Sequence, residues 1–110
     1  MGEKEYTRYL GDDGVVRVRV RLVTDGGRVV AVMVQLEARV DGEWWPLVRY
    51  DDAHGMLHRD VLDPAGRETK TPLPLPDRES FLAYAEQDLD DRWEWYLDRF
   101  TVQARRRKKP

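Results

Sequence analysis

Residues that transfer protons or bind anions are concentrated in one stretch of the chain, RYDDAHGMLHRD at positions 49–60. The stretch holds both histidines of the sequence, His54 and His58, and Lys70 follows ten residues after Asp60. Histidine changes its charge readily near neutral pH, and arginine or lysine stabilises an anionic phosphate or a developing negative charge. This combination is suited to a metal-independent ribonuclease. In such an enzyme one group takes a proton from the 2′-hydroxyl and another protonates the leaving oxygen.

A metal site is an alternative use of the same residues, because histidine and carboxylate are ligand types for zinc and other divalent ions. On a continuous strand, residues four apart lie about 13 Å from each other. His54 and His58 can therefore share an ion only if the chain turns back at His54-Gly55 or forms a helical segment there, which Gly55 disfavours. His58 and Asp60, two residues apart, can point from one face toward a common ligand. Because the cluster lacks a complete ligand signature, we predict no metal and no cofactor.

The same residues can instead have a structural role. His54 can cap a turn, His58 can hydrogen-bond Asp60 or a neighbouring strand, and Arg49 and Arg59 can pair with nearby carboxylates across a hairpin. The protein would then be a non-enzymatic interaction module. Convergence of the side chains in one cleft favours the enzyme, whereas histidines that point to opposite faces favour the module.

The string RYDDAHGMLHRDVLDPAGRETK, residues 49–70, resembles a pattern found in small prokaryotic domains of unknown function, R-Y-D-x-A-H-G-x-x-H-x-D followed by a Gly and a Lys. It is also distantly similar to the TumE-like toxins, which carry an R-Y-D motif followed by paired histidines, where this chain has AHG and a single later histidine. The match covers 22 of the 110 residues. This resemblance implies a toxin-like ribonuclease with RNA as its target and an antitoxin-like protein as its partner. The matching residues are Arg49, Asp51, His54 and His58.

Residue chemistry and the resemblance together define a candidate catalytic site. It straddles a predicted turn between two strands, and loops held by a rigid sheet are common places for function. Its six members are Arg49, Asp51, His54, His58, Asp60 and Lys70.

Alternating apolar and charged residues predict the strands that hold this site. The segment VVRVRVRLVT, residues 15–24, places valines on one face and arginines on the other. Asp25-Gly26-Gly27 and Asp41-Gly42 are hairpin-turn signals, and Pro46 marks an edge position or a bulge. Further strands are predicted at residues 29–40, 43–50 and 56–62, with a short strand at about 67–71 and an edge strand at about 5–10 as optional additions.

The C-terminal part of the chain predicts a helix. Residues 71–76, TPLPLP, form a stiff extended connector that ends the sheet region at about 5–71. Asp77 is a suitable N-cap, and apolar residues then recur at helical spacing over about 77–103, before a basic tail at 104–110. We expect one α+β domain over residues 1–110, a four- or five-stranded antiparallel meander packed by one long C-terminal helix. The predicted apolar stripe of the helix consists of Leu82, Ala85, Leu89, Trp93, Tyr96 and Phe100.

Composition excludes several classes of protein. The absence of cysteine rules out disulfide scaffolds, cysteine-based zinc sites, iron–sulfur clusters and thiol nucleophiles. Because no apolar run is long enough to span a bilayer and the N-terminus lacks an apolar signal core, we expect a cytoplasmic protein without a membrane partner.

The distribution of charge limits contacts with nucleic acid. Five of the 19 basic residues lie at 105–109, so the rest of the chain has 14 basic against 21 acidic groups, a net charge of −7. Binding of RNA must therefore use the tail or a local pocket. The alternative for the tail is a solvated terminus that complements the helix dipole.

The tryptophans Trp44, Trp45, Trp93 and Trp95 can stack bases or line a pocket, or they can belong to the core. Because adjacent strand residues point to opposite faces, one member of the pair Trp44–Trp45 must leave the core side. A single helix covers only one face of a sheet. We therefore expect a second copy of the chain to cover the other face in a homodimer.

Overall fold

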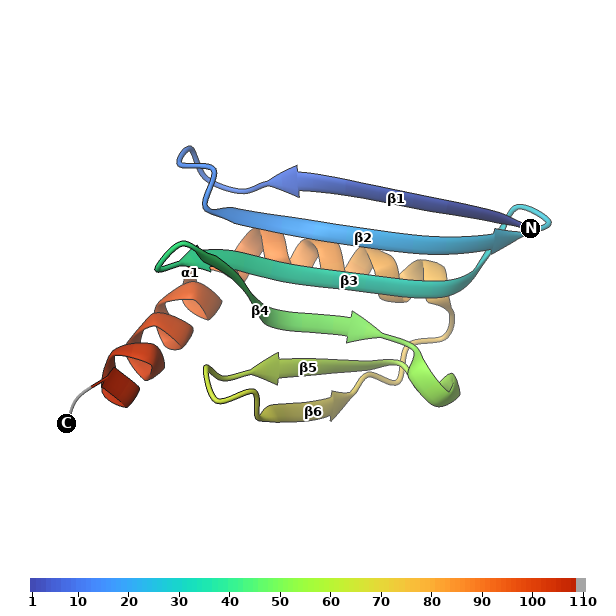
Figure 1. Ribbon diagram of the computed structural model, residues 1–110. Coiled ribbons are helices and arrows are strands. Elements are labelled where there is room, and N and C mark those ends of the chain that lie inside the picture. The colour runs from blue at the N-terminus through green and yellow to red at the C-terminus, as the bar shows by residue number, and fades with distance from the viewer. Residues whose placement is uncertain (109–110) are drawn as a thin grey trace.

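The computed structural model describes residues 1–108, without the side chains of His54 and Lys108. Its strands form a single antiparallel sheet in which each strand pairs with the next along the chain (Figure 1). A short 3₁₀ turn, η1 (Ala53–Gly55), separates β4 from β5. The strands are β1 (Gly2–Tyr9), β2 (Val16–Asp25), β3 (Arg28–Val40), β4 (Glu43–Asp51), β5 (His58–Leu62) and β6 (Glu68–Pro72).

The sheet therefore has six strands, where four or five were expected. The difference lies at the N-terminus, where β1 pairs with β2 over its whole length, from Gly2 opposite Thr24 to Tyr9 opposite Arg17. Charged residues on both faces of β1 hide the period of two that identifies a half-buried strand. β1 is the edge strand that the sequence indicated at about 5–10, and it begins earlier.

Both predicted glycine turns join long strands. Gly26 and Gly27 have φ angles of 58° and 80° between β2 and β3, and Asp41 and Gly42 have 54° and 82° between β3 and β4. Two consecutive residues in the left-handed region make the two-residue turn that matches the twist of a hairpin. These turns fix the register in which apolar residues of β2 and β3 share one face.

Pro46 lies at a bulge, one of its two predicted settings. The register between β3 and β4 shifts between Leu36 and Glu37, so that Leu47 becomes an extra residue. Both Leu47 and Val48 are consequently buried on the same side. The bulge also sends Trp45 toward the core, with its ring 6.0 Å from that of Phe100.

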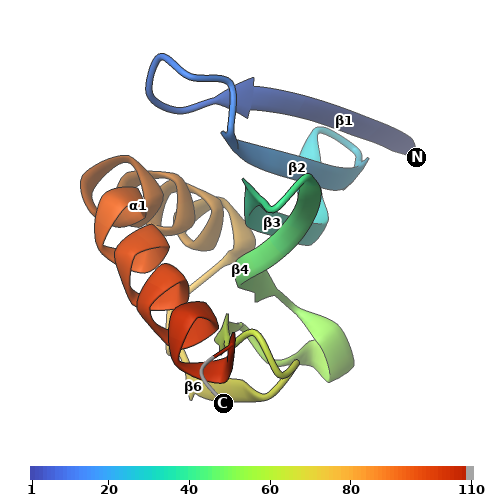
Figure 2. The ribbon, with the colours of Figure 1, turned by 60° about the vertical axis from the view of Figure 1, so that its left-hand side comes forward.

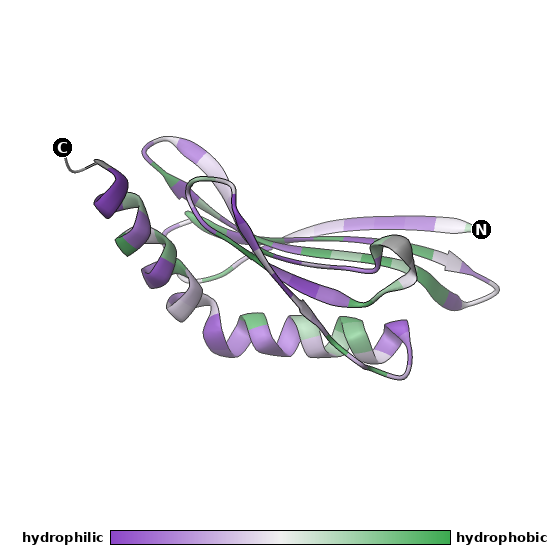
Figure 3. Ribbon diagram, turned by 90° about the horizontal axis from the view of Figure 1, so that it is seen from below, coloured by the Kyte–Doolittle hydropathy of each residue, from purple (hydrophilic) through white to green (hydrophobic). Residues whose placement is uncertain are grey.

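The helix α1 (Arg78–Lys108) lies across one face of the sheet (Figures 1 and 2). Asp77 caps it, because its Oδ1 accepts a hydrogen bond from the backbone N–H of Ser80 at 2.7 Å. The helix continues through the segment that was predicted as a basic tail, and its last turns are mostly hydrophilic (Figure 3). Residues 109–110 of that tail lie outside the described residues.

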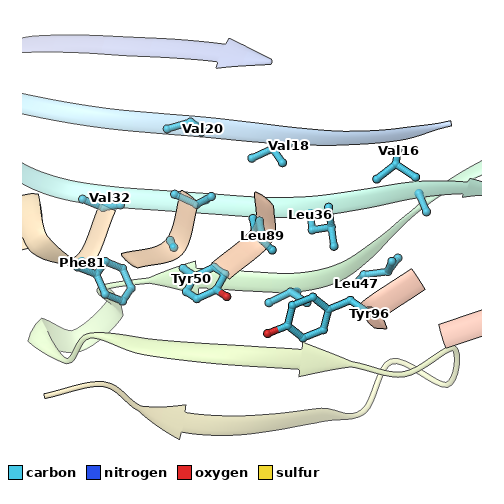
Figure 4. Close-up of a cluster of buried hydrophobic side chains, with 14 of the residues drawn as sticks. Val16, Val18, Val20, Val32, Leu36, Leu47, Tyr50, Phe81, Leu89 and Tyr96 are labelled. Atoms are coloured by element: carbon cyan, nitrogen blue, oxygen red, sulfur yellow. The ribbon is translucent and has the colours of Figure 1, made fainter. Parts of the chain in front are cut away.

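The core fills the space between α1 and the sheet (Figure 4). Its strand residues come from alternate positions of β2, β3 and β4, as the period of two predicts, apart from the adjacent pair Leu47 and Val48 at the bulge. Its helix residues recur at three- or four-residue spacing. The helix contributes Phe81 in addition to the predicted Ala85, Leu89, Tyr96 and Phe100, whereas Leu82 and Trp93 are only partly buried. Within the described residues, no helix combines the length and the apolar character needed to cross a membrane.

The opposite side of the sheet, here called the open face, carries polar and charged side chains. Within residues 1–108, no second layer covers it (Figure 2). Its charged and amide residues, identified by register, are Glu3, Glu5, Arg17, Arg19, Arg21, Gln35, Glu37, Arg39, Arg49, Asp51, His58, Asp60, Glu68 and Lys70.

Candidate functional site

Five of the six candidate residues lie together on the open face. Arg49 stands opposite Asp60, which stands opposite Lys70, so one cross-strand row joins β4, β5 and β6. In the adjacent row Asp51 stands opposite His58. Residues opposite one another in an antiparallel sheet point to the same side, which brings these side chains together. The side chain of His54, the sixth candidate, lies outside the described part of the structure.

His58 is at the centre of this group, between two carboxylates. Its Nε2 lies 2.8 Å from Asp51 Oδ1, and its Nδ1 lies 3.3 Å from Asp60 Oδ1. The second contact is not aligned as a hydrogen bond. His58 and Asp60 are each 3% exposed, whereas the side chain of Asp51 is 22% exposed. Solvent and ligands therefore reach this trio through Asp51.

The Asp51 carboxylate is held in a fixed orientation. Besides the imidazole, the backbone N–H of Ala53 in η1 donates to its Oδ1 at 2.9 Å. Asp51 and Ala53 also line a cleft of about 340 Å³ on the open face, together with Arg21, Ala31 and Met33. The only carboxylate of the trio that solvent reaches readily thus borders a space large enough for a small organic group.

Two cations flank the trio. Lys70 Nζ lies 3.3 Å from Asp60 Oδ1, and the Lys70 side chain is 48% exposed. Arg49 is half-buried, and its Nε donates to the neutral Gln35 Oε1 at 2.8 Å. Within the described residues no carboxylate lies within ion-pair distance of Arg49. An anion can therefore approach this guanidinium without displacing an ion pair.

The network continues across the sheet through two residues that the sequence did not single out. Gln35 Nε2 donates to Glu37 Oε2, and Glu37, which is 5% exposed, pairs with Arg17 at 2.7 Å and Arg19 at 3.5 Å. Alternation placed Gln35 and Glu37 on the polar face, but only the register of β3 shows that they support Arg49.

The trio has the right atoms for a metal but an unsuitable arrangement. Donor atoms of Asp51, His58 and Asp60 all lie within 4.8 Å of one another. The two carboxylates, however, approach different ring nitrogens, and one ion binds only one nitrogen of an imidazole. An ion at Nδ1 would have His58 and Asp60 as ligands and the Lys70 ammonium beside it, short of the three or four protein ligands of zinc sites. The geometry instead suits a carboxylate oriented through hydrogen bonds.

A second polar cluster lies on the opposite side of the sheet, between β4, β5 and α1. The hydroxyls of Tyr50 and Tyr96 both donate to Asp88 Oδ2, Tyr96 at 2.6 Å, and Arg59 Nη1 lies 3.6 Å from the same oxygen. Burial, followed by the hydrogen bond to Asp88, raises the pKa of both tyrosines. Arg59 therefore faces α1, on the opposite side of the sheet from its neighbours His58 and Asp60. In the sequence, the signal for this cluster was Asp88, which lies seven residues after Phe81 and therefore on the buried side of the helix.

A family model for a domain of unknown function, DUF7718, matches residues 1–106. The chain belongs to this family. The DUF7718 match includes all six strands and nearly all of α1, so the candidate site lies inside it. No curated protein and no solved structure matches the chain. The similarity to TumE-like toxins gains no support from these comparisons.

Proposed function

We propose that the open face is the active site of a toxin-like, metal-independent ribonuclease with Asp51 as the general base. One observation carries the proposal. The Asp51 carboxylate borders a cleft, is oriented by buried His58 and the Ala53 N–H, and shares the open face with two cations, Arg49 on the same strand and Lys70 two strands away. We place its action in the cytoplasm, where its substrate is.

The proposed reaction is an intramolecular displacement at phosphorus. Asp51 takes the proton of a ribose 2′-hydroxyl, and the 2′-oxygen attacks the adjacent phosphorus. The bond from phosphorus to the 5′-oxygen breaks, and the Lys70 ammonium gives a proton to the leaving oxygen. The products are a 2′,3′-cyclic phosphate and a 5′-hydroxyl. His58 does not touch the substrate in this scheme and is a positioning residue.

The spacing of the residues suits one phosphate group. Arg49 and Asp51 are two residues apart on β4, or about 7 Å, and β6 lies two strands from β4, or about 10 Å. A phosphate beside Asp51 is then within reach of the long side chains of Arg49 and Lys70. The Arg49 guanidinium is placed to stabilise negative charge on the non-bridging oxygens as it develops.

Cleavage of a labelled single-stranded RNA in the presence of EDTA tests this proposal. Asp51→Asn keeps an oxygen for His58 and Ala53 but removes the base, so we expect cleavage to fall by a factor of about 100 or more. The control is Asp91→Asn on α1, whose carboxylate accepts only from Gln87 in the described network, at 3.0 Å. Asp51→Asn with wild-type cleavage would reject Asp51 as the base.

The competing function is a non-enzymatic module with structural histidines, which forms a homodimer through the open face. The burial of His58 and Asp60 to 3% favours a structural role for the imidazole. Under this account wild-type protein leaves RNA intact and light scattering shows twice the chain mass of 13.0 kDa. The ribonuclease account requires an uncovered open face, and its antitoxin-like partner would act by covering Asp51.

A further inference from the structure

The end of the open face remote from Asp51 carries two aromatic rings and two arginines, here called the aromatic patch. It consists of Tyr9, Arg17, Arg39 and Trp44. The Arg17 guanidinium carbon lies 3.8 Å from the centre of the Trp44 ring, and the Tyr9 and Trp44 rings meet edge to face with centroids 6.5 Å apart. Tyr9 is 56% exposed, and exposed Arg39 stands opposite Trp44 in the register.

We propose that the aromatic patch binds bases of a single-stranded RNA whose scissile phosphate lies at Asp51. The second half of this statement rests on the proposed ribonuclease function, while binding at the patch does not. Aromatic rings with neighbouring arginines are the usual platform for unpaired bases, because every base has a face that stacks on them. The occupant is therefore a flexible single strand with accessible bases.

The charges of the patch are complementary to a phosphate backbone. Arg17 shares the single carboxylate of Glu37 with Arg19, so these three residues have a net positive charge. Arg39 adds a second positive charge, and no carboxylate of the described residues is within ion-pair distance of it. The aromatic patch therefore has a net positive charge, whereas the body of the chain is acidic. This charge favours binding of a phosphate backbone at the patch.

The patch and the candidate site are joined by a continuous surface. Trp44 and Asp51 are the second and last residues of β4, seven positions apart, or about 20 Å with the bulge included. Arg49 lies between Trp44 and Asp51 on the same face. Arg19 of β2 stands opposite Gln35 of β3, next to Arg49. A strand of several nucleotides can thus reach from the patch to Asp51 past two arginines.

An exposed tryptophan on α1 offers a rival surface. Trp95 on α1 is 49% exposed, and the guanidinium carbons of Arg92 and Arg99 lie 5.1 Å and 5.7 Å from its ring centre. This helix lies on the other side of the sheet, so a strand bound there would have to pass round a sheet edge to reach Asp51 (Figure 2). Trp95 is therefore the matched control for Trp44.

The test is fluorescence anisotropy with a short labelled oligouridylate, in the Asp51→Asn background so that RNA is not cleaved. Each of the added changes Tyr9→Ala and Trp44→Ala should raise the Kd by about tenfold, the effect of one lost base stack, whereas Trp95→Ala should leave it unchanged. Circular dichroism checks that each variant is folded. Tyr9, exposed on an edge strand, provides a reliable variant if Trp44→Ala fails to fold.

Each outcome decides the proposal. A loss of binding in Trp95→Ala alone would place RNA on α1 and overturn it. Equal binding by all variants, or no binding by the Asp51→Asn protein, would also overturn it, the latter leaving a protein partner as the occupant of the patch. Weaker binding in the Tyr9 and Trp44 variants, with wild-type protein that fails to cleave RNA, would retain the RNA surface and reject the ribonuclease.

Discussion

At the scale of single residues, the environment of His58 determines what the open face can do. The imidazole is buried with one nitrogen toward Asp51 and the other toward Asp60. Its Nε2 is placed to donate to Asp51, whereas its close contact with Asp60 is not aligned as a hydrogen bond. Removing the ring would leave the Asp51 and Asp60 carboxylates without this partner, which is costly for a buried charge. We therefore infer that His58 contributes strongly to stability as well as orienting Asp51.

The first prediction concerns the removal of this imidazole. His58→Leu leaves Asp60 buried without the ring beside it, and we expect the free energy of unfolding to fall by about 3 kcal/mol, as for a broken buried pair. The control is Lys4→Met at an exposed position of β1, where a loss below about 1 kcal/mol is expected. Urea denaturation measures both values. Equal transition midpoints for His58→Leu and wild type would show that the ring is not a structural partner.

A second prediction at this scale concerns alkaline pH. Burial and the hydrogen bond to Asp88 raise the pKa of Tyr50 and of Tyr96 above the unfolded value of about 10. The stability from their neutral hydroxyls is therefore fully present below pH 10 and is lost as the pH rises above it. Phenolate absorbance followed beside circular dichroism should show these two tyrosines ionising as the protein unfolds. Their complete ionisation in the folded protein would contradict this expectation.

Part of the site was predictable from residue spacing alone. Arg49 with Asp51, and His58 with Asp60, are two residues apart on strands and share a face by the period of two. The contact between Asp51 and His58 depends on the register across η1, which no local pattern specifies. Gln35, more than ten residues away along the chain, was missed for the same reason. The short spacing of His54 and His58 drew attention to a metal shared by the two rings; the side chain of His54 lies outside the described residues, and the described partners of His58 are the carboxylates of Asp51 and Asp60.

At the scale of elements, strands and their connections were predicted correctly where a turn signal and a regular spacing of apolar residues occur together. The two glycine turns and the Pro46 bulge appear where the sequence indicated them. β1 was harder to recognise because both of its faces carry charges. The end of α1 was predicted at about residue 103, whereas the helix continues to Lys108, because no glycine or proline lies between these positions. The apolar stripe ends near residue 103, but the helix continues because the arginines and lysine that follow have a high helix propensity.

The prediction at this scale tests the packing of α1. Leu89 is fully buried against the sheet, and Leu89→Ala should lower the free energy of unfolding by about 3 kcal/mol through lost burial and a cavity. Val102, also on α1, is 45% exposed, and Val102→Ala should change it by no more than about 0.5 kcal/mol. Chemical denaturation compares the two variants. Similar effects at the two positions would mean that α1 is not docked along Leu89.

At the scale of the whole molecule, the two sides of the sheet carry different kinds of side chain. The side that faces α1 holds the apolar core and the Asp88 cluster, whereas the open face holds paired charges, a cleft and the aromatic patch. A homodimer was expected because one helix leaves one sheet face uncovered. That face is rich in charged residues, which are depleted in the centres of stable interfaces. These residue types favour a polar ligand over a second copy.

The ribonuclease activity of the open face is tested by incubating wild-type protein in EDTA with RNA and with DNA of the same sequence. Because the proposed nucleophile is the 2′-oxygen, we expect RNA to be cut to fragments with 2′,3′-cyclic phosphate ends, while DNA, which lacks this oxygen, stays intact. Mass spectrometry of the fragments identifies the ends. RNA that stays intact after prolonged incubation, or DNA that is cut equally well, would contradict the ribonuclease account.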